Sequence, residues 1–597
     1  MIMLATFTTT VLLAKTRIGA IVWCGVCLLF ASPLFAANQT WQGDSGTLWQ
    51  TTGNWSGNAL PGIPDTAFFN DTATGTTVTS NNTTTVGTLN FSGGTAFTFA
   101  LTNPIYLRNA AALTSTSSVQ QTLGGTNFRG GATGNATFTN NGTGLIDFNA
   151  DILKEDVSGA SSSTNNGNLI FTGTGDWAVE RVGKRFGNLQ SGLTKQGTGT
   201  LTVEGAFNTF DTSGTDVTGL TGTITIANGG GRLRMQHVDA LGTGNITIQT
   251  AGTNTGTLEL ALTGTNVFTN TFNGFSSANV QSGANFPAGN PQILNTSGDN
   301  TITSNLTVAS TGGHGLNVAS NGGLLTLAGN ITTTVDQFRT LSLGGAASGI
   351  VSGNILNFGA QAFSVEKTGT GTWTLSGTGN TYTGTTEVRQ GTLLANGVLS
   401  TTPIVVHNGA TFGGTGVVGG SITVNNGGTL SPGAAIESLV AGVLTLNNGS
   451  TFNYQMDSSA ALSVAADLQV VSGNLNLTGA VTLDLIDLAA SPEPFDIGTT
   501  FSLLNYSGIW NGGMFTFGGA TLADGDFFLA FGNQWQIDYD STTGGANFTG
   551  DFLPNSLFVN ITATPEPTSV TLWLGVAAMA FVGGWRLRSR RPHGPAK

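Results

Sequence analysis

The chain has 597 residues, of which only 8% are charged, 39% are hydrophobic and 89 are glycine. This is not the composition of a disordered protein, which combines low hydrophobicity with high charge. A formal net charge of -12 makes nucleic acid a poor partner, because phosphate binding requires clustered lysine and arginine.

The first 37 residues have the pattern of a secretory signal peptide. Lys15 and Arg17 precede an apolar run from Ile18 to Phe30, and small residues follow up to a cleavage site near Ala36. The run is short for a membrane span, which favours a signal peptide over the alternative of a retained N-terminal anchor.

Both cysteines of the chain, Cys24 and Cys27, lie in this run. The exported protein is then free of cysteine, which excludes disulfides and thiolate–metal chemistry. Removing the signal peptide and the C-terminal tail also takes away seven of 19 basic residues but only one of 31 acidic residues. The exported protein is therefore strongly acidic.

Residues 38–71 concentrate aromatic side chains and predict an N-terminal aromatic cap. Trp41, Trp49 and Trp55 are followed by Phe69. A stack of repeats requires an atypical terminal unit that closes its first hydrophobic layer. The alternative is an exposed aromatic surface that binds sugar rings.

From residue 72 to residue 494, short alternating runs such as GTLTVEG, GTITIANG and GSITVNNGG are separated by Gly, Thr and Asn. Such alternation predicts β-strands, and the glycines and asparagines between the runs predict turns. Threonine suits the solvent face of these strands because it is β-branched yet polar. We therefore expect an all-β body.

One internal repeat aligns without gaps. LTKQGTGTLTVEGAFNTF at Leu193–Phe210 matches VEKTGTGTWTLSGTGNTY at Val365–Tyr382, with Lys195 at the position of Lys367. Both copies resemble the autotransporter-associated β-strand repeat of exported bacterial β-solenoids. The resemblance implies a right-handed parallel β-helix, and Asn408–Gly433 is similar to further coils of one.

Coils of roughly 20 to 25 residues are at the short end of known repeats. Stacked about 4.8 Å apart, they would make residues 72–494 and their caps a rod on the order of 100 Å long. The alternative is a row of β-sandwich domains, but the Pro-rich linkers that would separate them do not occur before Pro492.

Residues 495–562 are richer in aromatic and acidic residues. We expect antiparallel strands here that cover the last open layer, because an uncovered end would expose strand edges. Asp524 and Asp526 are candidate calcium ligands in this C-terminal cap. Two carboxylates fall short of the roughly six to eight oxygen ligands that calcium takes.

Two polar clusters are candidates for polysaccharide chemistry, since parallel β-helices include lyases and hydrolases. Such enzymes need convergent carboxylates, or a base near calcium-binding carboxylates. The first cluster is Asp176, Glu180, Arg181, Lys184 and Arg185, and the second is Arg232, Arg234 and His237. Glu180 and Lys184 should share one strand face, so an outward salt-bridged patch explains the first cluster and a solvated edge the second. We assign no catalytic residue, no metal and no cofactor.

Residues 563–597 contain the most specific motif of the chain. Pro565, Glu566 and Pro567 precede an uncharged run at 570–585, and four arginines follow: Arg586, Arg588, Arg590 and Arg591. With the two residues before it, the run reaches the lower end of the roughly 17 to 25 residues that span a bilayer. The positive-inside rule predicts a cytoplasmic basic tail.

This order of motif, transmembrane helix and basic tail resembles the PEP-CTERM sorting signal. The resemblance implies an exosortase partner that cleaves near the motif, in Gram-negative bacteria that form biofilms and make exopolysaccharide. The chain would be held in the membrane transiently and then reach the cell surface or the extracellular space. A plain single-pass anchor is the alternative. An autotransporter barrel is not expected, because residues 495–562 are too few to build one.

The sequence therefore predicts an exported, non-enzymatic β-solenoid with a structural or adhesive role at the cell surface or in the extracellular matrix. Exopolysaccharide or another surface polymer is the candidate partner. The alternative is a polysaccharide-binding or polysaccharide-degrading protein on the same scaffold.

Overall fold

The structure is a computed structural model that describes residues 38–565 except 126, 131–133, 155–166, 185–190, 206–217, 230, 252–253, 279–290, 309–314, 337 and 434. The expected signal peptide and the sorting segment from Glu566 onward lie outside the described residues. The described chain is almost entirely β-structure, with short 3-10 helices η1 (Thr52–Asn54), η2 (Leu462–Val464) and η3 (Thr549–Asp551). None of the described helices is long and apolar enough to cross a membrane.

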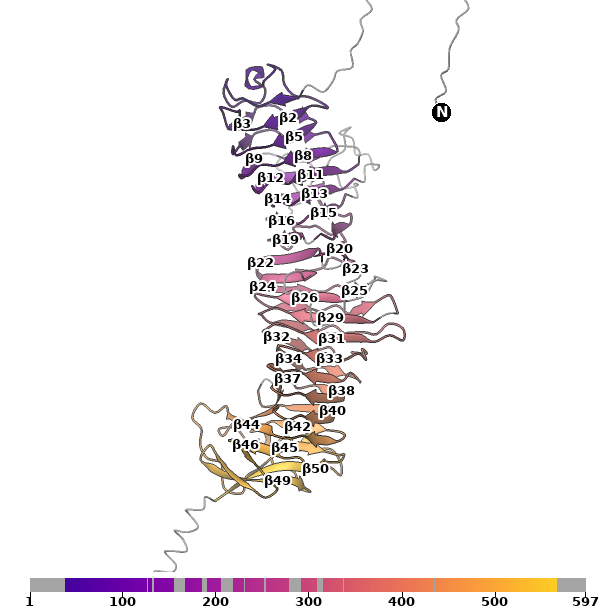
Figure 1. The fold of residues 1–597 in the computed structure, drawn as a ribbon, viewed down its shortest axis with the longest axis vertical. Coiled ribbons are helices and arrows are strands. Elements are labelled where there is room, and N and C mark those ends of the chain that lie inside the picture. Colours follow the sequence, from indigo (N-terminus) through magenta and orange to yellow (C-terminus); the bar gives the residue numbers. More distant parts are fainter. Residues whose placement is uncertain are drawn as a thin grey trace, which may run out of the picture.

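The strands stack along the long axis of an elongated molecule, from indigo to yellow in Figure 1. One run of neighbouring strands passes from end to end, and every pair in it is parallel. Its strands are β3 (Thr77–Ser80), β6 (Thr98–Leu101), β9 (Gln121–Gly125), β12 (Ile146–Lys154), β14 (Trp177–Lys184), β16 (Thr200–Val203), β19 (Arg232–Met235), β22 (Thr257–Phe268), β24 (Ile293–Ile302), β27 (Leu325–Leu327), β30 (Gly349–Val351), β32 (Thr372–Leu375), β34 (Gly391–Ala395), β37 (Ala410–Gly414), β39 (Thr429–Pro432), β41 (Thr451–Met456), β44 (Val481–Asp487) and β46 (Phe515–Phe517). The expectation of an all-β body is confirmed.

A separate 11-stranded sheet belongs to the N-terminal half. It contains β1 (Gln39–Thr40), β2 (Thr66–Phe69), β5 (Thr88–Phe91), β8 (Ala111–Ser115), β11 (Ala136–Asn140), β13 (Leu169–Gly173), β15 (Leu193–Lys195), β18 (Ile224–Ile226), β20 (Ile246–Ala251), β21 (Asn254–Thr255) and β23 (Phe272–Ala278). The remaining strands up to β45 are β4 (Thr84–Val86), β7 (Ile105–Leu107), β10 (Phe128–Gly130), β17 (Thr218–Gly219), β25 (Leu306–Val308), β26 (Leu316–Ser320), β28 (Ile331–Thr333), β29 (Arg339–Gly344), β31 (Phe363–Lys367), β33 (Thr386–Val388), β35 (Val398–Leu399), β36 (Ile404–Val406), β38 (Val417–Val424), β40 (Ser438–Leu446), β42 (Leu468–Val471), β43 (Leu475–Leu477) and β45 (Thr500–Tyr506). Among them, β17 pairs antiparallel with the end of β14.

The length of chain between stacked strands varies more than the repeat suggested. Paired residues are 18 positions apart at Thr411 and Thr429, but 35 positions apart at Leu258 and Ile293. The expected coil length of about 20 to 25 residues therefore lies within the observed range but does not describe every coil. Longer coils add residues between strands and leave the parallel pairing intact.

Alternation within the strands builds the core. In β41, for example, Phe452, Tyr454 and Met456 are fully buried, while the residues between them are partly exposed. Glycine makes the tight corners possible: Gly197 and Gly369, equivalent in the two repeat copies, have φ of +69° and +68°. A Cβ at either position would lie 2.2 or 2.4 Å from a carbonyl oxygen of the preceding coil, so only glycine fits.

Asparagine side chains hold one set of corners together. The Oδ1 atom of Asn305 accepts from the backbone N–H of Asn330 at 2.9 Å, and Oδ1 of Asn330 accepts from Asn354 at 3.0 Å. Asn354 in turn accepts from the N–H of Gly379 at 2.8 Å. Each side chain thus satisfies a backbone donor of the next coil, which a turn would otherwise leave to solvent.

The aromatic segment at the N-terminal end packs inward. Trp41, Trp49 and Trp55 are at most 1% exposed, and the ring centroids of Trp49 and Trp55 are 4.7 Å apart. Phe69 of β2 contacts all three tryptophans and links them to Phe91 of β5. The alternative of a sugar-binding aromatic surface is wrong for these residues, because no tryptophan ring among them faces solvent.

The C-terminal end changes from parallel to antiparallel pairing. Here β45 pairs in parallel with β42 and antiparallel with β50 (Leu557–Thr564), and β49 (Asn533–Ser541) lies between β50 and β48 (Phe527–Ala530). A short hairpin of β46 and β47 (Ala520–Thr521) completes the unit. The expected antiparallel strands are present, but β45 and β46 still extend the parallel stack.

A buried polar group ties this unit to the stack. The carboxylate of Asp467 accepts from the backbone N–H groups of Glu437 and Gln455, both at 2.9 Å. The Asn547 amide donates to the Asp467 carbonyl at 2.6 Å and to Tyr454 Oη at 3.2 Å. Burial raises the pKa of Asp467 to about 8. The end of the stack therefore contains a titratable group that is shielded from solvent.

Candidate functional surface

The first candidate cluster separates into outward and inward residues. Arg181 forms a two-pronged ion pair with Asp151 of β12, with Nε–Oδ1 at 2.6 Å and Nη2–Oδ2 at 3.0 Å. Asp176 accepts instead from the backbone N–H of Thr200 at 2.7 Å. Arg185 lies outside the described residues. The salt-bridged patch exists, but its acidic partner is Asp151 rather than a residue of the predicted cluster.

Lys184 corrects the sequence prediction. It was expected to share an outward face with Glu180, yet it is 1% exposed and its Nζ donates to Thr221 Oγ1 at 2.6 Å. The pairing of β14 with β12 shifts register in this segment, so two successive residues, Glu180 and Arg181, are partly exposed. The strict alternation that the prediction assumed is interrupted there.

The second candidate cluster is centred on an acidic residue that was not predicted from the sequence. Glu259 of β22 is 3% exposed and lies opposite Arg234 in the strand register. Its carboxylate is 3.0 Å from Arg234 Nε and 3.4 Å from Arg232 Nη1. His237 stands apart, 3.9 Å from the exposed Asp239. The predicted basic solvated edge is therefore two arginines around one buried carboxylate.

The two clusters do not converge on one site. Within the described part of the chain, no ion pair or hydrogen bond joins Glu180, Arg232 and His237. Arg181, Arg232 and Arg234 each pair with a carboxylate of the adjacent coil, and His237 lies near Asp239 of its own coil. A groove that gathers these residues as catalytic groups is not what their contacts describe.

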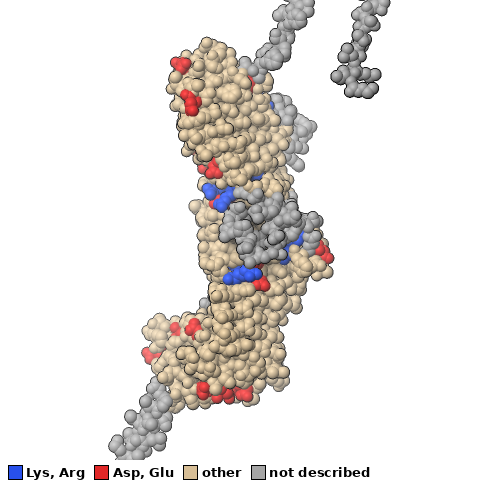
Figure 2. All heavy atoms as spheres, in the orientation of Figure 1, with Lys and Arg blue, Asp and Glu red and all other residues tan. Residues whose placement is uncertain are grey.

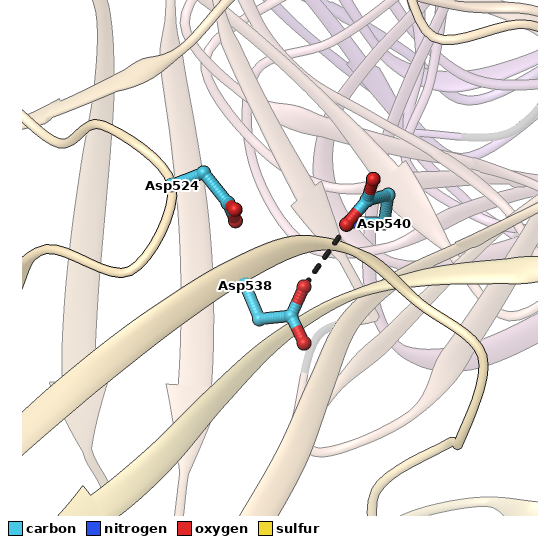
Figure 3. A group of neighbouring side chains, drawn as sticks. All are labelled: Asp524, Asp538 and Asp540. Carbon is cyan, nitrogen blue, oxygen red and sulfur yellow. Dashed lines mark hydrogen bonds between the residues drawn. The ribbon is translucent and has the colours of Figure 1, made fainter.

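The acidic residues of the C-terminal unit are arranged differently from the predicted pair. Asp524 lies beside Asp538 and Asp540 of β49 (Figure 3), and one carboxylate oxygen of each residue lies within 4.8 Å of the others. Asp526 instead accepts from the backbone N–H of Ala523 at 2.7 Å. Asp524 Oδ1 already accepts from the Tyr539 N–H at 3.0 Å. The two candidate calcium ligands, Asp524 and Asp526, therefore do not share this cluster. Three exposed or half-exposed carboxylates alone do not make a calcium site.

The repeat lysines have a structural role. Lys367 is fully buried, and its Nζ donates to the carbonyl oxygens of Thr368, Gly369 and Gln390 at 2.7, 2.7 and 2.9 Å. Lys195, its equivalent, donates to the carbonyls of Gln196 and Gly197 at 2.5 and 3.2 Å. Burial lowers the pKa of each lysine to about 8. The lysine thus satisfies the corner carbonyls of its own Gly-Thr-Gly turn.

The second repeat copy also contains an ion-pair group that was not predicted. Glu366 of β31 and Glu387 of β33 are directly opposite in the register, where like charges repel. Arg389 pairs with both carboxylates, and His407 Nε2 contacts Glu387. The register of the two strands brings these two carboxylates together, and the sequence alone does not show that register.

Charge is unevenly distributed along the molecule. On the face shown in Figure 2, lysine and arginine gather midway along the body, whereas only acidic residues appear toward the C-terminal end. In the sequence, residues 390–565 contain no lysine or arginine at all. The chain therefore presents a mixed-charge middle and an acidic end.

Comparison with known proteins identifies part of this chain. The passenger-associated-transport-repeat family matches residues 365–395, which confirms the repeat predicted from Val365 onward. The Adhesin BmaC autotransporter of Brucella suis biovar 1 (strain 1330) is 32% identical over 192 residues. That alignment covers 31% of this chain but only 5% of the adhesin. The chain is thus an all-β protein that contains an autotransporter-associated repeat and is similar in part to an adhesin.

Proposed function

We propose that this chain is an exported, non-enzymatic structural or adhesive protein of the cell surface or extracellular matrix, built as a right-handed parallel β-solenoid. The observation that carries the proposal is the unbroken run of parallel strands from β3 to β46, whose interior is filled by apolar side chains. A stiff stack of this kind suits a spacer that presents surfaces at a distance. Similarity to part of an adhesin supports the same role.

An attachment assay tests this role. Host cells that lack the chain should adhere less to surfaces or to one another than cells that produce it, and external addition of the purified chain should compete. The purified chain should not shorten the host's own exopolysaccharide. Attachment that is unchanged by loss of the chain would contradict the proposal.

We further propose that an exosortase recognises Pro565, Glu566 and Pro567, with residues 570–585 as a transient membrane anchor and Arg586, Arg588, Arg590 and Arg591 as the cytoplasmic tail. The support is the order of these parts in the sequence. Mass spectrometry of surface material should lack peptides from Leu587 onward. Their retention on the mature chain would refute cleavage, and mislocalisation after deletion of the three-residue motif would support sorting.

A polysaccharide-degrading function is the alternative, and one group of residues favours it. Asp147 of β12, Glu180 of β14 and Glu204 lie on successive coils, with the N–H of Gly205 donating to the Glu180 carbonyl at 2.7 Å. Burial, followed by the charges of Asp147 and Glu180, raises the pKa of Glu204. A carboxyl group whose pKa is raised near a second carboxyl group is a feature of glycoside hydrolases. Depolymerisation of exopolysaccharide that disappears in Glu204→Gln would favour this alternative.

A further inference from the structure

A column of threonines runs along the C-terminal half of the stack. The strands β32, β34, β37, β39, β41, β44, β46 and β47 each place a threonine at the same register position. These residues are Thr372, Thr392, Thr411, Thr429, Thr451, Thr482, Thr516 and Thr521, and we call them the threonine ladder. Neighbouring strands lie about 4.8 Å apart, so the ladder repeats at that interval along the axis that is vertical in Figure 1.

The ladder hydroxyls are available for binding. Thr516 Oγ1 donates to the Val481 carbonyl at 3.1 Å, but no other ladder hydroxyl forms a hydrogen bond with another described residue. The side chains other than Thr516 are half-buried or exposed. Elsewhere the chain uses threonine hydroxyls internally, as at Thr88 and Thr333, which donate to backbone carbonyls at 2.6 and 2.8 Å. Each ladder hydroxyl can donate one hydrogen bond and accept others.

The fold does not require threonine at these positions. The column two residues further along the same strands contains Thr374, Leu394, Gly413, Ser431, Asn453 and Asp484. Many residue types are thus compatible with this face of the stack. The ladder is therefore a row of hydroxyls that the strand pairing itself does not require.

The negative charge of the surrounding segment limits which kinds of partner can bind to the threonine ladder. Residues 390–565, which contain most of the ladder, have no lysine or arginine, and Glu437, Asp457 and Asp484 are among their acidic residues. A polyanion would be repelled, and two copies of this segment placed face to face would repel each other. The remaining partner is an uncharged chain with many hydroxyl groups.

We propose that the threonine ladder is a binding site for an uncharged polysaccharide, whose chain lies along the long axis and exchanges hydrogen bonds with successive hydroxyls. The side chains are pre-ordered, because β-branching restricts χ1 and the sheet fixes their spacing. Binding would then come from many weak hydrogen bonds at regular intervals along the ladder rather than from one deep pocket. The inference rests on the proposed adhesive function and names the partner of that surface.

Co-sedimentation of the full-length protein in detergent with insoluble cellulose, mannan and galactan tests the site. The triple variant Thr411→Val, Thr429→Val and Thr451→Val removes three hydroxyls and keeps the β-branched shape. The matched control is Thr137→Val, Thr225→Val and Thr247→Val, half-buried threonines on the 11-stranded sheet whose hydroxyls also lack a described partner. We expect at least one polymer to bind, with affinity reduced about tenfold or more in the triple variant and unchanged in the control.

Several results overturn the proposal. They are failure of all three polymers to bind, equal binding by the triple variant, preferential binding of polyanionic alginate, and loss of self-association rather than polymer binding in the triple variant. If cells still attach through the chain while the triple variant binds polymers normally, the ladder assignment fails and the adhesive function stands. If loss of the chain leaves attachment unchanged, the adhesive function itself fails.

Discussion

Residues 108–389 and residues 390–565 have the same stacked architecture but very different surfaces. All described lysines and arginines lie in the first region, where ion pairs connect one coil to the next, as between Arg181 and Asp151. The second region has no such cation and instead presents the threonine ladder. The inward residues and the corners therefore determine the fold, while the outward columns are free to carry function.

The largest expected effect concerns the corners that both repeat copies share. Lys367→Met should lower the free energy of unfolding by about 3 kcal/mol, because up to three buried carbonyls lose their donor. Lys195→Met should cost less, since Lys195 donates to only two described carbonyls. Denaturant titration of both variants measures this difference. Equal or negligible losses would contradict a structural role for the repeat lysine.

The buried lysines of the first region and the buried Asp467 of the second region should make the stability of the fold depend on pH in opposite directions. The pKa of Lys195 and of Lys367 falls from 10.5 to about 8 on folding, so between these values the unfolded chain binds more protons and stability rises with pH. The pKa of Asp467 rises from 3.8 to about 8, so below pH 8 its contribution falls as pH rises.

Unfolding measured across this range should therefore show a minimum of stability near pH 8. The slope above pH 8 is at most about 1.4 kcal/mol per pH unit for each lysine. In the double variant Lys195→Met and Lys367→Met the rise above pH 8 should become smaller, and Lys184, whose pKa burial also lowers, should account for what remains. The fall below pH 8 should be unchanged. An undiminished rise in the double variant would rule out this explanation.

A smaller effect is expected for the ion pairs of the first region. Glu259→Gln should lower the free energy of unfolding by about 1 kcal/mol, because Arg232 and Arg234 lose their shared carboxylate but are each about one-third exposed. Asp484→Asn, at an exposed position in the second region, is the matched control and should change it by less than about 0.5 kcal/mol. The loss at Glu259 should also shrink at high salt.

The smallest effect is expected on the ladder. Thr411→Val, Thr429→Val and Thr451→Val should each change the free energy of unfolding by less than about 0.5 kcal/mol, because their hydroxyls make no described internal hydrogen bond. Thermal unfolding of the triple variant measures this directly. A large destabilisation would mean that the hydroxyls serve the fold, which would remove the basis for polysaccharide binding.

The residues that point into the core could be predicted from the alternation of apolar and polar residues along each strand. The repeat lysines follow the same alternation. In LTK and VEK, alternation places Lys195 on the face of Leu193 and Lys367 on the face of Val365, and all four are buried. Alternation does not show which groups accept hydrogen bonds from these buried lysines. The acceptors are the carbonyl oxygens of the adjoining corner, which stabilise the buried ammonium group.

Pairing between coils could not be predicted. Glu259 meets Arg234 only because 25 residues separate paired positions there, whereas 35 separate Leu258 and Ile293 in the next coil. Lys184 was misplaced for a related reason, since a local register shift interrupts the alternation of β14. The ladder likewise becomes visible only when the register of successive coils is known.

A surface or matrix protein must reach the outside of the cell, and a single introduced cysteine can show whether this chain does. Ile509 is 74% exposed, and the exported chain should contain no cysteine, so Ile509→Cys introduces a single reactive thiol. A membrane-impermeant maleimide should label this variant on intact cells and should not label the unsubstituted chain. Labelling only after the cells are broken open would contradict a surface or matrix role.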